Sequence, residues 1–247
     1  MSTFTRGEMP RQDLDDSARW IAECEEAGLD YTHGRAEDFF LPEEEFKRLR
    51  RGAHDLALYR TPDWAAEAVV RRLDCVRLGQ TDTLSVLDAG AGDGAFCRAL
   101  LKCGFDASQI TAIEFCKRHE HALLTLAAQV WIGDFREWWE SRRPRFDVIV
   151  MNPPFARSAE FFLTAWSVLR PHGQIAMLNR IDYASSAVRA ELHRRYPPSV
   201  GVFSNRPSFV AGGTTDSWNY AAFYWTKNGR TTPGEFFVIP DGNYDAD

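Results

Sequence analysis

The chain lacks any long hydrophobic run. No apolar segment among its 247 residues approaches the ~20 residues that a membrane-spanning helix needs. Met1 to Asp16 is polar and of mixed charge, which is not the pattern of a secretory signal peptide. There is also no internal repeat and no low-complexity segment, so a repeat architecture is excluded. We therefore expect a soluble, cytoplasmic protein that does not bind membranes.

Cysteine is scarce and shows no pattern. The five cysteines are an odd number, and their spacings match no zinc or redox motif. They are Cys24, Cys75, Cys97, Cys103 and Cys116. Their usage predicts reduced thiols with structural roles and no metal site.

Positive charge is not in excess, since the net charge is −6. Residues 1–58 hold 14 acidic and 8 basic residues, whereas residues 59–247 hold 21 of each. The acidity therefore belongs to the N-terminal segment, and the neutral remainder can still carry a local basic face. We expect an acidic, partly disordered helical arm over 1–58 that can bind a protein partner, a main domain over 59–228, and a tail over 229–247.

What is present is an alternation of strands and helices. Apolar runs separated by helical segments predict a mainly parallel sheet with right-handed crossovers. The predicted strands cover residues 84–87, 110–113, 130–132, 148–151 and 173–179, followed by 201–203 and 218–225. The last two have no helix-sized connection and should pair antiparallel at one edge. The predicted fold is a doubly wound, mostly parallel α/β sheet of seven strands with an antiparallel edge strand.

A glycine-rich loop follows the first predicted strand. Gly90, Gly92 and Gly94 permit positive φ and a close approach of a ligand to the backbone. Such a loop alone is weak evidence, because it also suits dinucleotide-binding folds. Two features argue against phosphate: Asp88 and Asp93 would repel an anion, and no Lys-Ser/Thr ending of a P-loop follows.

Carboxylates recur at the ends of three successive strands. Asp88 can attract an amino-acid ammonium. Glu114 lies 20 residues after Gly94 and can accept both hydroxyls of a ribose. Asp134 closes the third strand, where it can accept from an adenine amino group. Ribose, adenine and a cationic amino-acid end together describe S-adenosylmethionine.

The fourth strand ends in Asn152-Pro153-Pro154-Phe155. Two prolines stop the strand because they cannot donate to a β ladder. The Asn152 amide can donate and accept hydrogen bonds, the Pro153 carbonyl can accept one, and Phe155 can stack on a flat ring. This pattern predicts a clamp for an amino group on a planar heterocycle.

These motifs resemble a known family. Residues 86–94 look like the first motif of class I S-adenosylmethionine-dependent methyltransferases, and residues 152–155 like the catalytic motif of N6-adenine methyltransferases. Tyr59-Arg60-Thr61-Pro62 resembles the aromatic-x-Thr-Pro motif of many N6-adenine DNA methyltransferases, and Thr61 and Pro62 are also a good N-cap and first residue for a helix. The resemblance covers roughly residues 59–225 and implies a Rossmann-like methyltransferase fold.

The resemblance also implies site residues. Those that would hold S-adenosylmethionine are Tyr59, Thr61, Pro62, Asp88, Gly90, Gly92, Gly94, Glu114, Asp134 and Phe135, and the catalytic set is Asn152, Pro153, Pro154 and Phe155. We expect nucleic acid, in the first place DNA, to contact a rim of basic and aromatic residues: Arg157, Arg180, Arg206, Phe209 and Trp218.

Several alternatives stay open. No segment is large enough for a separate DNA-recognition domain, so recognition of a target sequence must be minimal or supplied by a partner, or the substrate is not duplex DNA. RNA adenine methylation is the second interpretation, since ribosomal RNA enzymes share the Asn-Pro-Pro-Phe turn. Methylation of a protein glutamine amide is the third, although that activity commonly has Tyr at the position of Phe155. A fourth is a catalytically silent scaffold, against which the complete set of Asp88, Glu114, Asp134 and Asn152 argues.

Overall fold

In this computed structural model the chain divides into two compact units, residues 1–58 and 59–247. The structure describes residues 19, 42–45, 47–49, 60–142, 144–185, 187–209, 218–228 and 234–240. In the first unit residues 43–45 and 47–49 are helical, and Lys47 pairs with Glu43 and Glu44 at 3.4 and 3.3 Å. The oppositely charged side chains are three and four residues apart, a spacing that stabilises an exposed helix.

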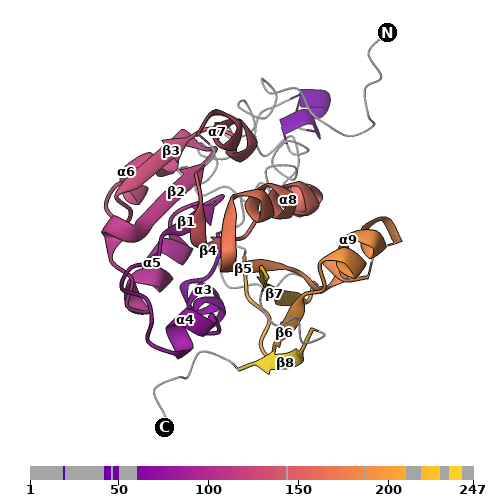
Figure 1. The fold of residues 1–247 in the computed structure, drawn as a ribbon. Coiled ribbons are helices and arrows are strands. Elements are labelled where there is room, and N and C mark those ends of the chain that lie inside the picture. The colour runs from indigo at the N-terminus through magenta and orange to yellow at the C-terminus, as the bar shows by residue number, and fades with distance from the viewer. Residues whose placement is uncertain are drawn as a thin grey trace. The chain divides into compact units, whose positions relative to one another are not determined.

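The described part of the second unit contains one eight-stranded sheet, in the order β3-β2-β1-β4-β5-β7-β6-β8 (Figure 1). The strands are β1 Val86–Ala89, β2 Ile110–Glu114, β3 Gln129–Ile132, β4 Phe146–Met151, β5 Leu169–Arg180, β6 Ser199–Phe203, β7 Tyr220–Thr226 and β8 Phe236–Ile239. Strands β1 to β5 pair parallel, and β7 lies antiparallel between β5 and β6. The predicted fold class is confirmed.

Strand β8 is an addition to the seven predicted strands. It falls in the segment assigned to a tail, and it pairs parallel with β6 at the edge of the sheet. Phe237 of β8 packs so closely over Gly201 of β6 that a Cβ there would lie 2.5 Å from its ring. Gly201 therefore makes room for an aromatic ring that closes this end of the sheet.

Helices cover both faces of the sheet (Figure 1). They are α3 Asp63–Val70, α4 Asp74–Arg77, α5 Ala95–Lys102, α6 Glu120–Leu123, α7 Phe135–Arg142, α8 Ser158–Val168 and α9 Ala190–Arg195. Strand residues alternate between two separate cores: Val148 and Val150 face one, Ile149 and Met151 the other. This period of two is what a strand buried on both faces requires.

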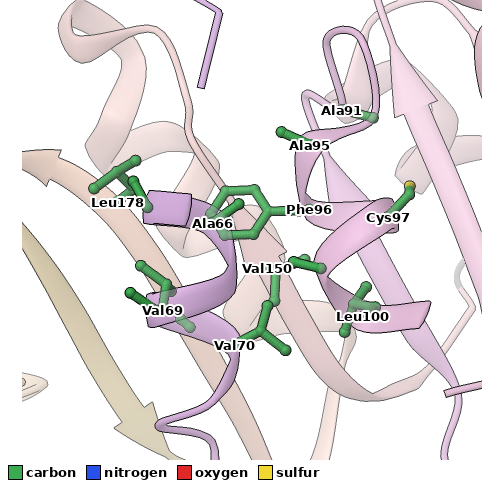
Figure 2. Packing of buried hydrophobic residues seen from close by; sticks show 14 of the residues in the cluster. Ala66, Val69, Val70, Ala91, Ala95, Phe96, Cys97, Leu100, Val150 and Leu178 are labelled. Carbon is green, nitrogen blue, oxygen red and sulfur yellow. The ribbon is translucent and has the colours of Figure 1, made fainter. Parts of the chain in front are cut away.

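Helices α3 and α5 pack against each other over the first core. Figure 2 shows Phe96 of α5 pointing towards Ala66 of α3, with Val150 of β4 beneath them. The alanines let the two helices approach closely, so the segment before α3 and the loop before α5 are held by the same contact.

Candidate functional site

The carboxyl ends of four parallel strands meet at one edge of the sheet. Ala89 of β1 lies opposite both Met151 of β4 and Ile113 of β2. Glu114 of β2 lies opposite Ile132 of β3. The glycine loop, the two carboxylates that follow it and the turn after β4 therefore share the edge where ligands bind in open α/β sheets.

The glycine loop has a backbone that favours glycine at three positions. Gly90, Gly92 and Gly94 have φ of 80°, 55° and 87°. At Gly94 a Cβ would also lie 2.5 Å from the side chain of Leu126, whereas at Gly92 it would point into open space. The loop is anchored because the N–H of Gly90 donates to the carbonyl of Ile113 at 2.9 Å. At Gly92 the backbone has no described protein atom within 4 Å of the position that a Cβ would take.

Asp88 is fully buried beneath this loop. The Cys97 thiol donates to its Oδ2 at 3.2 Å, and Oδ1 finds no hydrogen-bond partner in the described residues. Burial, with the nearby carboxylates of Glu114 and Asp93, raises the pKa of Asp88 to about 7. A cationic group is what this environment lacks, so the residue suits the ammonium predicted for it.

Glu114 is also buried, with two hydrogen bonds already made. Its Oε2 accepts from the N–H of Gly92 at 2.7 Å, and its Oε1 accepts from the N–H of Cys116 at 2.8 Å. Burial raises the pKa of Glu114 despite these two donors. Each carboxylate oxygen has further lone-pair capacity, so ribose hydroxyls can be accepted beside the backbone bonds.

Asp134 is held from two directions. Its Oδ1 accepts from the N–H of Arg136 at 2.8 Å, and both terminal nitrogens of Arg157 donate to its Oδ2 at 3.1 Å. Burial alone would raise the pKa of Asp134, but the Arg157 charge and the backbone donors outweigh it and the pKa is lowered. Asp134 is therefore an ionised acceptor.

The neighbouring Phe135 is 4% exposed. It packs on Phe161 and Trp138, with ring centroids 5.5 and 6.4 Å away. Phe135 is thus a core residue next to Asp134, and its contact with the cofactor stays a prediction.

The segment before α3 differs from its sequence prediction. Tyr59 lies outside the described residues. The N-cap of α3 is Pro62, no side chain caps the helix, and the first helical residue is Asp63. The prediction of Thr61 as N-cap is wrong because its hydroxyl is engaged elsewhere: it accepts from Nδ2 of Asn152 at 2.9 Å.

The turn after β4 brings a carboxamide to the glycine loop. A Cβ on Gly90 would lie 4.0 Å from the backbone oxygen of Asn152, so the two motifs touch. With Nδ2 bound to Thr61, the Oδ1 of Asn152 is buried and finds no partner among the described residues. Pro153 is buried and Pro154 half-buried. The site thus contains a buried acceptor aimed by its neighbours and left without a donor.

A second pair of buried polar side chains holds the turn from below. Asn179 at the end of β5 donates to Oγ of Ser158 at 2.7 Å. Ser158 in turn donates to the carbonyl of Phe155 at 3.0 Å. Ser158 and Asn179 are 1% and 2% exposed, so this bridge is shielded from water.

Phe155 is half-buried and packs on Tyr220, with 5.9 Å between ring centroids. Phe209 packs on the same tyrosine at 4.3 Å and is 4% exposed. Phe209 therefore supports Phe155 from inside the core, and its burial disfavours the predicted contact with nucleic acid.

The predicted basic rim is only partly at the surface. Arg157 pairs with Asp134 and Glu160, so its guanidinium lies beside the carboxylate that follows β3. Arg180 pairs with Asp182 and lies over the ring of Trp218, which is 47% exposed. Arg206 is exposed. A role for these residues in binding nucleic acid stays a prediction.

The sequence reading missed three buried site residues: Cys97, Ser158 and Asn179. Ser158 had a recognisable signal, because a serine directly after a Pro-containing turn often bonds nearby backbone. Asn179 had none, since its partner is 21 residues away. Among the described residues no cluster of three or more His, Cys, Asp or Glu could hold a metal ion. The described helices are all too short or too polar to cross a membrane.

Comparison with known proteins agrees with this geometry. The sequence model of the methyltransferase small domain family matches residues 59–194, more than half of the chain. A release factor glutamine methyltransferase of Agrobacterium fabrum is 35% identical over 98 residues, which cover 38% of this chain and 34% of that protein. A tRNA1(Val) (adenine(37)-N6)-methyltransferase of Klebsiella pneumoniae is 33% identical over 78 residues, 28% of this chain and 32% of that protein.

The match to these curated relatives spans about a third of their length. A solved structure from Listeria monocytogenes, described as a class I S-adenosylmethionine-dependent methyltransferase, superposes with a TM-score of 0.54 at 11% identity. It covers 93% of this chain and 84% of its own, which supports the fold. With a family match over the glycine loop, the carboxylates and the Asn152 turn, the chain belongs to the methyltransferase small domain family of S-adenosylmethionine-dependent methyltransferases.

Proposed function

We propose that the chain transfers the methyl group of S-adenosylmethionine to the N6 amino group of adenine in a nucleic acid. The observation that carries the proposal is the Asn152 carboxamide, whose Oδ1 is buried and finds no donor among the described residues. The backbone of the same residue lies close to Gly90 of the glycine loop. A buried acceptor left unpaired costs about 1–3 kcal/mol. An exocyclic amino group would supply the missing donor at the point where the reacting nitrogen must lie.

The cofactor, when bound, supplies a methyl group already activated by the sulfonium charge. The protein therefore mainly has to hold a nitrogen in line with that methyl. Asn152 and the Pro153 carbonyl accept hydrogen bonds from the amino group, which draws its lone pair out of conjugation with the ring. Phe155 offers a ring for the base to stack on. The adenine amine requires no prior deprotonation, so no histidine or cysteine is needed as a general base. As the N–C bond forms, the C–S bond breaks and leaves a neutral thioether, and the methylated nitrogen then releases one proton to solvent.

The three carboxylates hold the cofactor. Asp88 takes the ammonium, since its orphan Oδ1 lies in a site rich in negative charge. Glu114 accepts the ribose hydroxyls, and Asp134 accepts from the adenine amino group. The empty space in front of Gly92 leaves room for the methionine part.

Two polymers could carry the adenine, DNA or RNA. The Tyr59 to Pro62 motif favours DNA, and a duplex target would have to be flipped out of its stack. The similarity to a tRNA adenine-N6 methyltransferase favours RNA. In either case Arg180, Arg206 and Trp218 are the proposed contacts for the chain that carries the base.

A second candidate function is methylation of a protein glutamine amide. It is favoured by the 35% identity to a release factor glutamine methyltransferase. The same unpaired Oδ1 of Asn152 would accept from the glutamine Nε2. Phe155 argues against it, because tyrosine is common at that position in enzymes of that kind.

The test is methyl transfer from labelled cofactor to duplex DNA, single-stranded DNA, RNA and protein, followed by mass spectrometry of the nucleosides and amino acids. We expect N6-methyladenine in at least one nucleic acid. We expect Asn152→Ala to lower kcat about 100- to 1,000-fold, as removal of one preorganised hydrogen-bonding group does. The exposed Gln80→Ala is the control and should keep full activity. Methylglutamine without methyladenine would replace the proposal by the second candidate.

A further inference from the structure

Thr61 and Asn152 form a side-chain contact between residues 91 apart in sequence. Thr61 is 8% exposed, and its Oγ1 lies 2.9 Å from Nδ2 of Asn152. The hydroxyl does not cap α3, although the sequence places it where a cap would stand. The Thr61 hydroxyl thus contacts the Asn152 amide and not the backbone of the helix.

A carboxamide has two ends of similar size and opposite hydrogen-bonding character. If Nδ2 of Asn152 faced the acceptor, its protons would oppose the protons of an incoming amino group. With Nδ2 held by Thr61, the end left without a partner is Oδ1, which can only accept. In this arrangement the accepting end of the amide is the one left for an incoming group.

The segment that carries Thr61 is itself held to the glycine loop. Arg60 pairs with Asp93 at 2.8 Å, and Asp63 pairs with Arg98 of α5 at 2.6 Å. Arg98 also donates to the backbone oxygen of Asp93 at 2.7 Å. The residues on both sides of Thr61 thus form ion pairs with the glycine loop and with α5. These ion pairs help to position the Thr61 hydroxyl for its contact with Asn152.

We propose that Thr61 is a positioning residue that fixes the Asn152 carboxamide with Oδ1 towards the acceptor nitrogen and so selects acceptors that carry N–H groups. This role rests on the proposed function of Asn152 and differs from the cofactor contact that the resemblance assigns to Thr61. It requires only the hydroxyl as an acceptor.

The kinetic test compares Thr61→Val with Thr61→Ser. Valine has the shape of threonine without the hydroxyl, so we expect kcat to fall about 10- to 100-fold because the amide loses its anchor. The affinity for S-adenosylmethionine, measured by calorimetry, should stay within about twofold of wild type, since the cofactor is held by other groups. Thr61→Ser should restore most of kcat.

A matched control is Thr111→Val in β2, at a threonine that is 7% exposed and three residues before Glu114. It should leave kcat unchanged. A loss of cofactor affinity in Thr61→Val as large as the loss of kcat would overturn the proposal in favour of a cofactor contact. An unchanged kcat in Thr61→Val would overturn it as well.

A second readout does not depend on activity. In the nitrogen-15-labelled full chain, the Nδ2 protons of Asn152, assigned by their disappearance in Asn152→Asp, should exchange slowly with water. Exchange should stay slow in Thr61→Ser and become at least about tenfold faster in Thr61→Val. Equal exchange in all three proteins would rule out the anchor. If wild type methylated no substrate while this pattern held, the proposed function would fail, and only the anchoring of the Asn152 amide by Thr61 would stand.

Discussion

At the scale of single residues, Asp88 shows how a site stores an unfavourable charge. Its carboxyl is fully buried, accepts a hydrogen bond from the Cys97 thiol and lies near Glu114 and Asp93. A cationic ligand, as proposed for this site, would relieve this cost. Asp88 is thus a residue whose environment makes sense only when the site is filled.

The pKa of Asp88 makes stability depend on pH. The folded pKa is about 7, against an ordinary value of 3.8. Between these values the unfolded chain ionises and the folded chain keeps its proton, so this contribution is present below pH 3.8 and lost as pH rises towards 7. Relative to Asp88→Asn, we expect the unfolding free energy of the cofactor-free protein to fall with pH by up to about 1.4 kcal/mol per unit. Urea denaturation at several pH values between about 5 and 8 measures this dependence. Parallel curves of unfolding free energy against pH for the two proteins would contradict the prediction.

At the scale of elements, the turn after β4, residues 152–155, is held by side chains from three directions. Thr61 reaches it from the segment before α3, Ser158 from the start of α8, and Asn179 from the end of β5. A Pro-Pro turn has few backbone donors of its own, so side chains set its position. The turn is therefore as rigid as the elements behind it.

We expect Ser158→Ala to lower the free energy of unfolding by about 1–3 kcal/mol, because it removes a donor to the Phe155 carbonyl and leaves Asn179 without its acceptor. Asn179→Ala should cost a similar amount, and the double variant less than the sum, since both act through one bridge. Urea titration with a double-mutant cycle measures this.

The control is Ser167→Ala near the other end of α8, where the hydroxyl bonds only to its own helix at Thr164. It should cost less than about 0.5 kcal/mol. Strict additivity of the Ser158 and Asn179 variants would show that the bridge is not a single unit.

At the scale of the whole molecule, the sheet is longer than its sequence suggested. Strand β8 extends it past β6, with Phe237 directed at Tyr224 and Arg72 while Phe236 points to solvent. The strand also reaches the turn that follows α3, because Arg72 donates to the carbonyl of Val238 at 3.5 Å. Phe237 of β8 thus packs on the core that α3 and α5 share.

Two adjacent phenylalanines test this closure. Phe237→Ala should lower the free energy of unfolding by about 1–3 kcal/mol, less than for a fully buried ring because Phe237 is only partly covered. Phe236→Ala makes the same chemical change on the outer face, where the residue is 73% exposed, and should stay within about 0.5 kcal/mol. Thermal unfolding distinguishes the two; equal losses would mean that β8 does not pack as described.

The parts of the fold that could be predicted are those with local signals. Buried strands followed by Asp88, Glu114, Asp134 and Asn152 placed the edge of the sheet, because each carboxyl end is marked within a few residues. Strand β8 escaped, since Phe236–Ile239 is short and follows Gly234 in an otherwise polar stretch.

The contacts that organise the site had no local signal. The contact of Thr61 with Asn152 and the pairing of Arg157 with Asp134 depend on how distant segments meet. Thr61 and Arg157 also had good local interpretations, Thr61 as a helix cap and Arg157 as a surface cation. Sequence patterns name the residues of such a site, but packing decides which of them share a bond.

The pairing of Arg157 has a consequence for how the two halves of the reaction communicate. The guanidinium of Arg157 pairs with Asp134, the carboxylate proposed to bind the cofactor's adenine. It also pairs with Glu160 of α8, the helix that follows the Asn152 turn. Coupling between two binding events is reciprocal by thermodynamic necessity. If binding of the cofactor weakened the ion pair between Arg157 and Asp134 and so changed the affinity for the methyl acceptor, binding of the acceptor would change the affinity for the cofactor by the same factor. A single shared cation would thus make the two ligands of this site each other's effectors.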